Sequence, residues 1–152
     1  MTPEADPSSP EASGGITVHA EHSRLTLDPS QINALASRMA SGEIVLWREV
    51  GIILGDHDLV RDLNKTWLGH DWNTDVVSFP LDEDARARGL IEGEVYVDLD
   101  TAEEIAPEVG ATVAQEALRY VAHGLLHLIG YDDATNEERE HMRNLEDRYL
   151  AR

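Results

Sequence analysis

The chain has 152 residues, about the length of one domain, and its 41 % apolar residues suffice for a single packed core. It contains no cysteine, which excludes a disulfide framework, a cysteine-ligated metal site and a cysteine nucleophile. Its 30 acidic and 12 basic side chains give a formal charge of −18, which argues against binding nucleic acid by bulk electrostatics but permits a local polyanion site.

The sequence predicts a cytoplasmic protein that does not contact a membrane. No apolar run approaches the roughly 18 residues of a membrane span, and the N-terminal segment lacks the basic and apolar regions of a secretory signal. Lys65 is the only lysine, beside eleven arginines. An acidic excess with so little lysine fits either a salt-rich host, where screening weakens self-repulsion, or an ordinary acidic surface.

Residues 1–14 are rich in Pro, Ser, Gly, Ala and Glu and predict a disordered tail, so that residues 15–152 form the single domain. In chain order, the hydrophobic pattern then predicts a strand over 16–26, a helix over 29–40 stopped at Gly42, a strand over 44–54, a helix over 58–69, a short strand over 74–80, a charged connection over 82–92 and a strand over 93–99.

Two helices complete the chain. The first covers 113–129 and ends at Gly130, and the second begins at Thr135, which forms a capping box with Glu138. Because strands come early and helices flank them, we expect an α+β domain with a small mixed β-sheet flanked by helices.

The helix predicted over 113–129 is apolar nearly all round, as is typical of a buried helix, yet it carries a polar stripe. Arg119, His123 and His127 recur every four residues and therefore share one face. Unpaired buried polar groups cost roughly 1–3 kcal/mol each, so the stripe needs partners. Two imidazoles one turn apart can bind one metal ion; the alternative is a pair of core histidines satisfied by hydrogen bonds.

The residues after this helix favour the metal. The pattern His123-x-x-x-His127-x-x-Gly130-x-x-Asp133 has the ligand spacing of the metzincin motif. Gly130 can adopt a left-handed backbone that ends the helix and turns the chain back, which lets Asp133 supply a third, oxygen ligand. Three protein ligands leave a fourth position for water, the arrangement of a catalytic zinc site that we expect for this zincin-like helix.

Three residues near the predicted ligands also bear on the chemistry: Gly124, Asp132 and His141. A metalloprotease of this motif has its glutamate general base at the position of Gly124, so peptide hydrolysis here lacks its proton acceptor and the chemistry is expected to differ. Gly124 also permits close approach of a substrate or of another backbone. Asp132 is a reserve ligand or a solvated turn residue, and His141 is expected at the surface.

Three blocks resemble the YbeY family of bacterial rRNA-maturation endoribonucleases. HGLLHLIGYDD over 123–133 is similar to the family signature HGxLHLxGYDH. LNKTWLGHDWNTDVVSFP over 63–80 resembles LNxxYRxxDxPTDVLSFP, and GEVYVDLDTA over 93–102 resembles a Gly-Asp-Ile strand of the family. The blocks occur in the family's order and spacing, and the resemblance covers about residues 43–150.

The resemblance implies metal-dependent cleavage of single-stranded RNA in maturation of the small-subunit rRNA 3′ end and in ribosome quality control. It assigns two metal-ligand histidines to His123 and His127 and places Asp133 where the third histidine usually stands. The implied cofactor is one zinc ion per chain, although two imidazoles and a carboxylate also suit manganese or iron. The implied partners are single-stranded rRNA and the ribosome or small-subunit proteins; the oligomeric state is not predicted.

Leu68 stands where most of the family has an arginine suited to holding a phosphate. Arg119, Lys65 or His70 could replace it, with a structural salt bridge as the alternative for Arg119. Three polar side chains of the strand predicted over 74–80 could contact RNA if this strand borders the cleft, with turn capping and strand packing as the alternatives: Thr74, Asp75 and Ser78.

The predicted function is therefore that of a metal-dependent endonuclease of single-stranded RNA, a hydrolase of phosphodiester bonds in rRNA processing and ribosome biogenesis. The metal would polarise a water or a phosphate oxygen, and either that water or the RNA 2′-hydroxyl could attack. No side chain is identified as the general base, and Arg119 is the candidate phosphate contact. The alternatives are a non-catalytic ribosome-maturation factor with a structural metal, and a metal-dependent hydrolase of another substrate.

Overall fold

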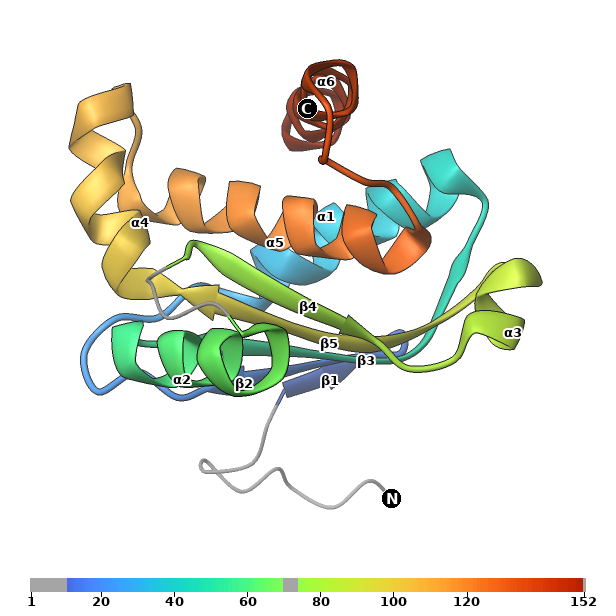
Figure 1. Cartoon of the computed structure of the whole chain (residues 1–152), viewed down its shortest axis with the longest axis horizontal. Helices are drawn as coiled ribbons and strands as arrows, with labels where there is room; N and C mark the ends of the chain where they lie inside the picture. Colours follow the sequence, from blue (N-terminus) through green and yellow to red (C-terminus); the bar gives the residue numbers. More distant parts are fainter. Residues whose placement is uncertain (1–10, 70–73, 152) are drawn as a thin grey trace.

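A five-stranded mixed sheet carries the rest of the fold in the computed structural model, which describes residues 11–69 and 74–151 (Figure 1). Its strands are β1 (Glu11–Ser13), β2 (Ile16–Ala20), β3 (Leu46–Gly55), β4 (Val76–Pro80) and β5 (Leu90–Asp98). They lie in the order β1-β2-β3-β5-β4. The three central strands β2, β3 and β5 are parallel, whereas β1 and β4 run antiparallel at the two edges.

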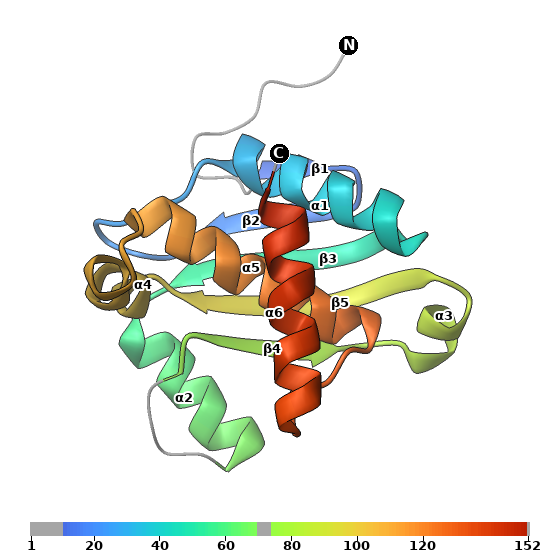
Figure 2. The ribbon, with the colours of Figure 1, turned by 90° about the horizontal axis from the view of Figure 1, so that it is seen from above.

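Helices cover one face of this sheet in two layers. Figures 1 and 2 show α1 (Pro29–Glu43) and α5 (Val113–Ile129) against the sheet, with α6 (Asn136–Leu150) crossing outside them. The helix α2 (His57–Leu68) packs against β4, β5 and α4 (Leu99–Ile105). Two short elements complete the fold, α3 (Glu83–Ala87) and the 3₁₀ helix η1 (Ala106–Val109). The predicted α+β class with a mixed sheet is confirmed.

The core lies between the sheet and the helices α1 and α5. Alternate residues of β5 are buried, among them Ile91, Val95 and Val97, as expected of a strand with one face on a core. They pack in one cluster with fully buried side chains of α5, such as Leu125. Because α5 lies between the sheet and α6, nearly all of its faces are buried, which explains why a helix with apolar side chains nearly all round is stable there.

Some element boundaries differ from those predicted. The strand predicted over 16–26 ends at Ala20, and the helix predicted over 29–40 continues past Gly42 to Glu43. Gly42 is not the stop: a Cβ there would lie 2.4 Å from Tyr149 Oη, so this glycine makes room for α6. The helix ends at Ile44, whose φ of 57° is left-handed.

Two predictions about irregular segments are corrected. Part of the predicted tail, Glu11–Ser13, forms β1, because strand pairing uses backbone groups that every composition supplies; residues 1–10 lie outside the described residues. The charged connection over 82–92 contains α3 and the start of β5. Capping side chains start α3 and the unpredicted α4: Asp82 accepts from Ala85 N, and Asp98 accepts from Thr101 N.

Gly124 sets how closely α5 lies on the sheet. A Cβ at this position would be 2.4 Å from Val95 Cγ1 and 3.1 Å from Ser78 Oγ. The Ser78 hydroxyl donates a hydrogen bond of 3.1 Å to the carbonyl of Gly124. The close approach that this glycine permits is therefore that of the chain's own sheet.

Replacing Gly124 with Ala tests this packing. An exposed helical site would gain about 1 kcal/mol from the substitution, whereas overpacking against Val95 is expected to lower the free energy of unfolding by about 1–3 kcal/mol. Urea denaturation monitored by circular dichroism measures the difference. Because the two effects have opposite signs, the expected net loss is about 0–2 kcal/mol, and an increased stability would show that α5 does not need a glycine here.

Candidate metal centre

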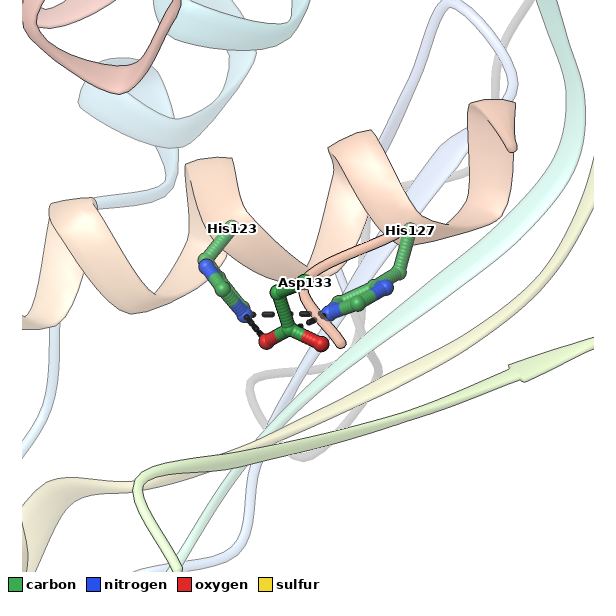
Figure 3. A group of neighbouring side chains, drawn as sticks. All are labelled: His123, His127 and Asp133. Atoms are coloured by element: carbon green, nitrogen blue, oxygen red, sulfur yellow. Dashed lines mark hydrogen bonds and ion pairs between the residues drawn. The ribbon is translucent and has the colours of Figure 1, made fainter. Parts of the chain in front are cut away.

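Three side chains predicted as ligands converge at the C-terminal half of α5 (Figure 3). His123 and His127 project from successive turns of the helix, and Asp133 reaches back from the loop before α6. The two Nε2 atoms are 3.0 Å apart, and Asp133 Oδ2 lies 3.2 Å from His123 Nε2 and 3.4 Å from His127 Nε2. The three donor atoms therefore face one another across one small space.

These separations fit coordination of a divalent ion. Donors bound at 2.0–2.2 Å to a tetrahedral zinc lie about 3.3–3.5 Å from one another, close to the spacings of His123, His127 and Asp133. Two imidazoles and one carboxylate also suit manganese or iron. Asp132, predicted as a reserve ligand or a solvated turn residue, is exposed and its carboxylate does not belong to this group.

The turn at Gly130 brings the carboxylate into place. Gly130 has a φ of 125°, and the N–H of Tyr131 donates to the carbonyl of Leu126 at 3.1 Å, the six-residue closure of a Schellman motif. The loop then turns back along α5, as predicted. Arg139 Nη1 donates to the carbonyls of Asp133 and Ala134 at 3.1 and 3.2 Å and so fixes the loop from α6.

Glu146 of α6 orients His123. Its carboxylate, 7 % exposed, lies 2.7 Å from His123 Nδ1 and accepts a hydrogen bond of 3.1 Å from Arg119 Nη1. A proton held on Nδ1 leaves the Nε2 lone pair free for a ligand bond, as in the carboxylate–histidine pairs of many metal sites. Arg119 also donates to Asp147 at 2.7 Å, so its guanidinium joins α5 to α6.

The charges around His123 attract a cation. Burial is the largest influence on the pKa of His123 and lowers it, but the hydrogen bond and charge of Glu146, together with Asp75 and Asp133, raise it above its usual value. The pKa of Asp75 is also raised, chiefly by desolvation, with His123 opposing the shift. The negative potential that holds a proton on an imidazole also favours a divalent ion.

Cavities lie on both sides of the three donors. One of about 420 Å³ lies beside His127 and is bordered by β4 through Val76, Ser78 and Pro80, so the strand borders the cleft as predicted. Ser78 is already bonded to Gly124, which supports a packing role. The second cavity, of about 350 Å³, is lined by His123, Asp75, Arg119 and residues of α6.

Position 124 cannot hold a metzincin proton acceptor. A Cβ at this position would point at Val95, Val76 and Ser78 of the sheet, and this single added carbon already meets Val95 Cγ1 at 2.4 Å. A glutamate at this position would have to displace α5 from the sheet. The close contact between α5 and the sheet thus explains why this chain has a glycine where the protease motif has a glutamate.

Comparison with known proteins gives consistent matches. A profile of the family described as "Endoribonuclease YbeY" matches residues 17–152. An Endoribonuclease YbeY of Salinibacter ruber is 42 % identical over 146 residues, 93 % of each chain. Another, of Sulfurihydrogenibium sp., is 46 % identical over 90 residues, 59 % of each chain. A solution structure from Thermotoga maritima, 30 % identical, aligns over 89 % of this chain and 86 % of that one with a TM-score of 0.58.

The chain belongs to the YbeY family of endoribonucleases. The predicted family is confirmed, and its relatives are named as enzymes that cleave RNA internally. Within residues 11–69 and 74–151, no helix has the length and apolar character that crossing a bilayer requires.

The position that departs from the YbeY signature on α2 lies at the cleft. Leu68 is 46 % exposed and lines the cavity beside His127. Among the predicted replacements for the family arginine, Arg119 is bonded to Glu146 and Asp147, Lys65 lies one turn earlier on α2, and His70 is outside the described residues. His141 is exposed, as predicted, with its ring 5.6 Å from that of Tyr131.

A second histidine–carboxylate group lies where the parallel strands β3 and β5 end, and sequence reasoning did not find it. It contains His57, Asp98 and Asp100. His57 Nδ1 lies 2.7 Å from Asp98 and Nε2 lies 2.9 Å from Glu104, so both ring nitrogens face carboxylates. The hydrogen bond to Glu104 is the main cause that raises the pKa of His57 to about 9. This arrangement suits an imidazolium, which cannot bind a metal.

Glu146→Gln is expected to weaken metal binding. Loss of the carboxylate that orients a ligand histidine typically costs 10–100-fold in metal affinity, and we expect a loss of about 10-fold or more here. Competition with a chromogenic chelator measures the affinity of each protein for zinc. Glu140→Gln, at an exposed position of α6, is the control, and an affinity equal in both variants would contradict the orienting role.

His57→Gln is expected to destabilise the fold in a pH-dependent way. Since the folded-state pKa of about 9 exceeds the ordinary value of 6.5, the stabilisation is complete below pH 6.5 and disappears as the pH rises through 9. Because Glu104 is largely exposed, we expect a loss of only about 1–2 kcal/mol at pH 6. Urea denaturation at pH 6 and pH 10 tests this, with His141→Gln as control; an equal loss at both pH values would argue against an imidazolium.

Proposed function

We propose that this chain is a metal-dependent, single-strand-specific endoribonuclease whose divalent ion is held by His123, His127 and Asp133. The observation that carries the proposal is the convergence of these three donors, 3.0–3.4 Å apart, between two cavities. Membership of the YbeY family supports RNA as the substrate. We assign the activity to one domain spanning residues 15–152.

Zinc is the ion we propose, with manganese or iron as substitutes that the same donors accept. When bound, a divalent ion supplies Lewis acidity toward a phosphate oxygen or a water molecule. The surrounding residues prepare the site: Glu146 keeps the proton of His123 on Nδ1, and Arg139 fixes the loop that carries Asp133. The strand β4 forms one wall of the cleft in which the RNA strand would lie.

The cellular setting is proposed from the family resemblance. We propose cleavage of single-stranded rRNA during maturation of the small-subunit 3′ end and in ribosome quality control, in the cytoplasm. The partners would be the ribosome or small-subunit proteins, which would bring the RNA to an otherwise acidic protein.

The substitution His127→Ala tests the proposal because it removes one of three ligands. We expect loss of bound metal and a loss of RNA cleavage of at least about 100-fold, since catalysis would depend on the ion. Elemental analysis of protein purified without an affinity tag measures the metal, and a single-stranded rRNA fragment measures cleavage.

The matched control is His141→Ala, which removes an exposed histidine outside the three donors and should retain both metal and cleavage. A chelator should abolish the wild-type activity, and zinc or manganese should restore it. Cleavage that persists without metal would refute the proposed mechanism. Metal binding without any RNA cleavage would favour a non-catalytic maturation factor.

A further inference from the structure

The cavity beside His123 contains three arginines in a chain of strongly negative charge. Arg119 comes from α5, and Arg139 and Arg143 come from α6. The two α6 arginines are one helical turn apart, so their like charges repel each other. The cationic side chains therefore gather beside the proposed metal centre, although acidic residues dominate the whole sequence.

Two of these arginines already have partners. Arg119 donates to Glu146 and Asp147 at 3.1 and 2.7 Å. Arg139 donates to the carbonyls of the loop that carries Asp133. Arg143 is exposed at the cavity and makes no hydrogen bond or ion pair with any part of the chain that the structure describes. Its guanidinium can bind a ligand without first breaking another contact.

The charge balance of this cavity indicates which ligand fits. Its three arginines face four carboxylates, those of Asp75, Glu116, Asp133 and Glu146. A divalent ion bound by the three donors would reverse the sign and leave a net positive cavity. Guanidinium groups bind phosphates through paired hydrogen bonds, so an anionic strand would find its best contact at the arginine without a partner.

We propose that Arg143 holds a phosphate of the RNA strand in the cavity beside His123. The inference rests on the proposed function, because it takes RNA as the ligand and a divalent ion at His123, His127 and Asp133. It assigns a binding contact to α6 and makes RNA affinity dependent on the ion. A phosphate held here lies in the cavity that the ligand His123 lines.

The test compares Arg143→Ala, Arg143→Lys and Arg148→Ala. Arg148 is exposed on the same helix, with its guanidinium 5.5 Å from the Tyr149 ring and outside both cavities, so its variant loses the same charge. Fluorescence anisotropy of a labelled single-stranded RNA, with and without zinc and over a range of salt, measures the binding. Steady-state cleavage of the same RNA gives KM and kcat.

For Arg143→Ala in zinc we expect roughly 10-fold weaker binding, the size of one charge-assisted hydrogen bond. KM should rise by a similar factor while kcat stays within about twofold, because the contact positions the strand without entering the bond cleavage. The dependence of log affinity on log salt should become shallower by about 0.7 for one lost phosphate contact. Arg143→Lys should recover part of the affinity, and Arg148→Ala should stay within about twofold of wild type.

Equal RNA affinity in Arg143→Ala and Arg148→Ala would overturn the inference, and so would wild-type binding that does not depend on zinc. Zinc content and unfolding temperature confirm that each variant is folded. If Arg143→Ala does not fold, Arg143→Gln replaces it in the same measurements. The two proposals fail differently. Metal-dependent cleavage that is insensitive to Arg143 refutes only this inference, whereas metal-dependent RNA binding that is sensitive to Arg143 but leads to no cleavage refutes only the proposed function.

Discussion

The carboxylate of Glu146 is the contact on which the arrangement of the site depends. It is buried between α5 and α6 and bonds to His123 with one oxygen and to Arg119 with the other. A buried carboxylate without such partners would cost several kcal/mol, so the pairing fixes how α6 lies on α5. The same helix then supplies Arg139, which fixes the loop of Asp133. The same carboxylate therefore both orients the ligand His123 and holds α6 against α5.

Much of this site was predictable because its residues are close in sequence. His123, His127, Gly130 and Asp133 lie within one helix end and one loop, so the period of the helix and the turn at a glycine fix their relative positions. The boundaries of α5 and the capping box of α6 matched for the same reason. The α+β class followed from the order of strands and helices, which local hydrophobic patterns report.

The remaining features depend on contacts between distant segments. Glu146 lies 23 residues from His123. The period of α6 places it on the buried face with Met142, Leu145 and Tyr149, but that period does not say which side chain of α5 it meets. The cluster around His57 forms only because parallel strands end at the same edge of the sheet. Gly42 was predicted to stop the first helix because glycine commonly ends helices. Its contact with Tyr149 joins the first and last helices, and the local sequence does not show that contact. Such roles follow from tertiary packing, which the period of a single element does not encode.

The contact between Gly124 and the sheet also limits how this metal-binding helix can change its chemistry. Proteases with the same ligand spacing add one acidic side chain between the two histidines. In this fold a Cβ at that position would lie 2.4 Å from Val95 Cγ1 and 3.1 Å from Ser78 Oγ, so a side chain there displaces the sheet or the helix. Acquiring peptidase activity would therefore require the helix and sheet to separate first, so a single codon change could not convert one enzyme into the other.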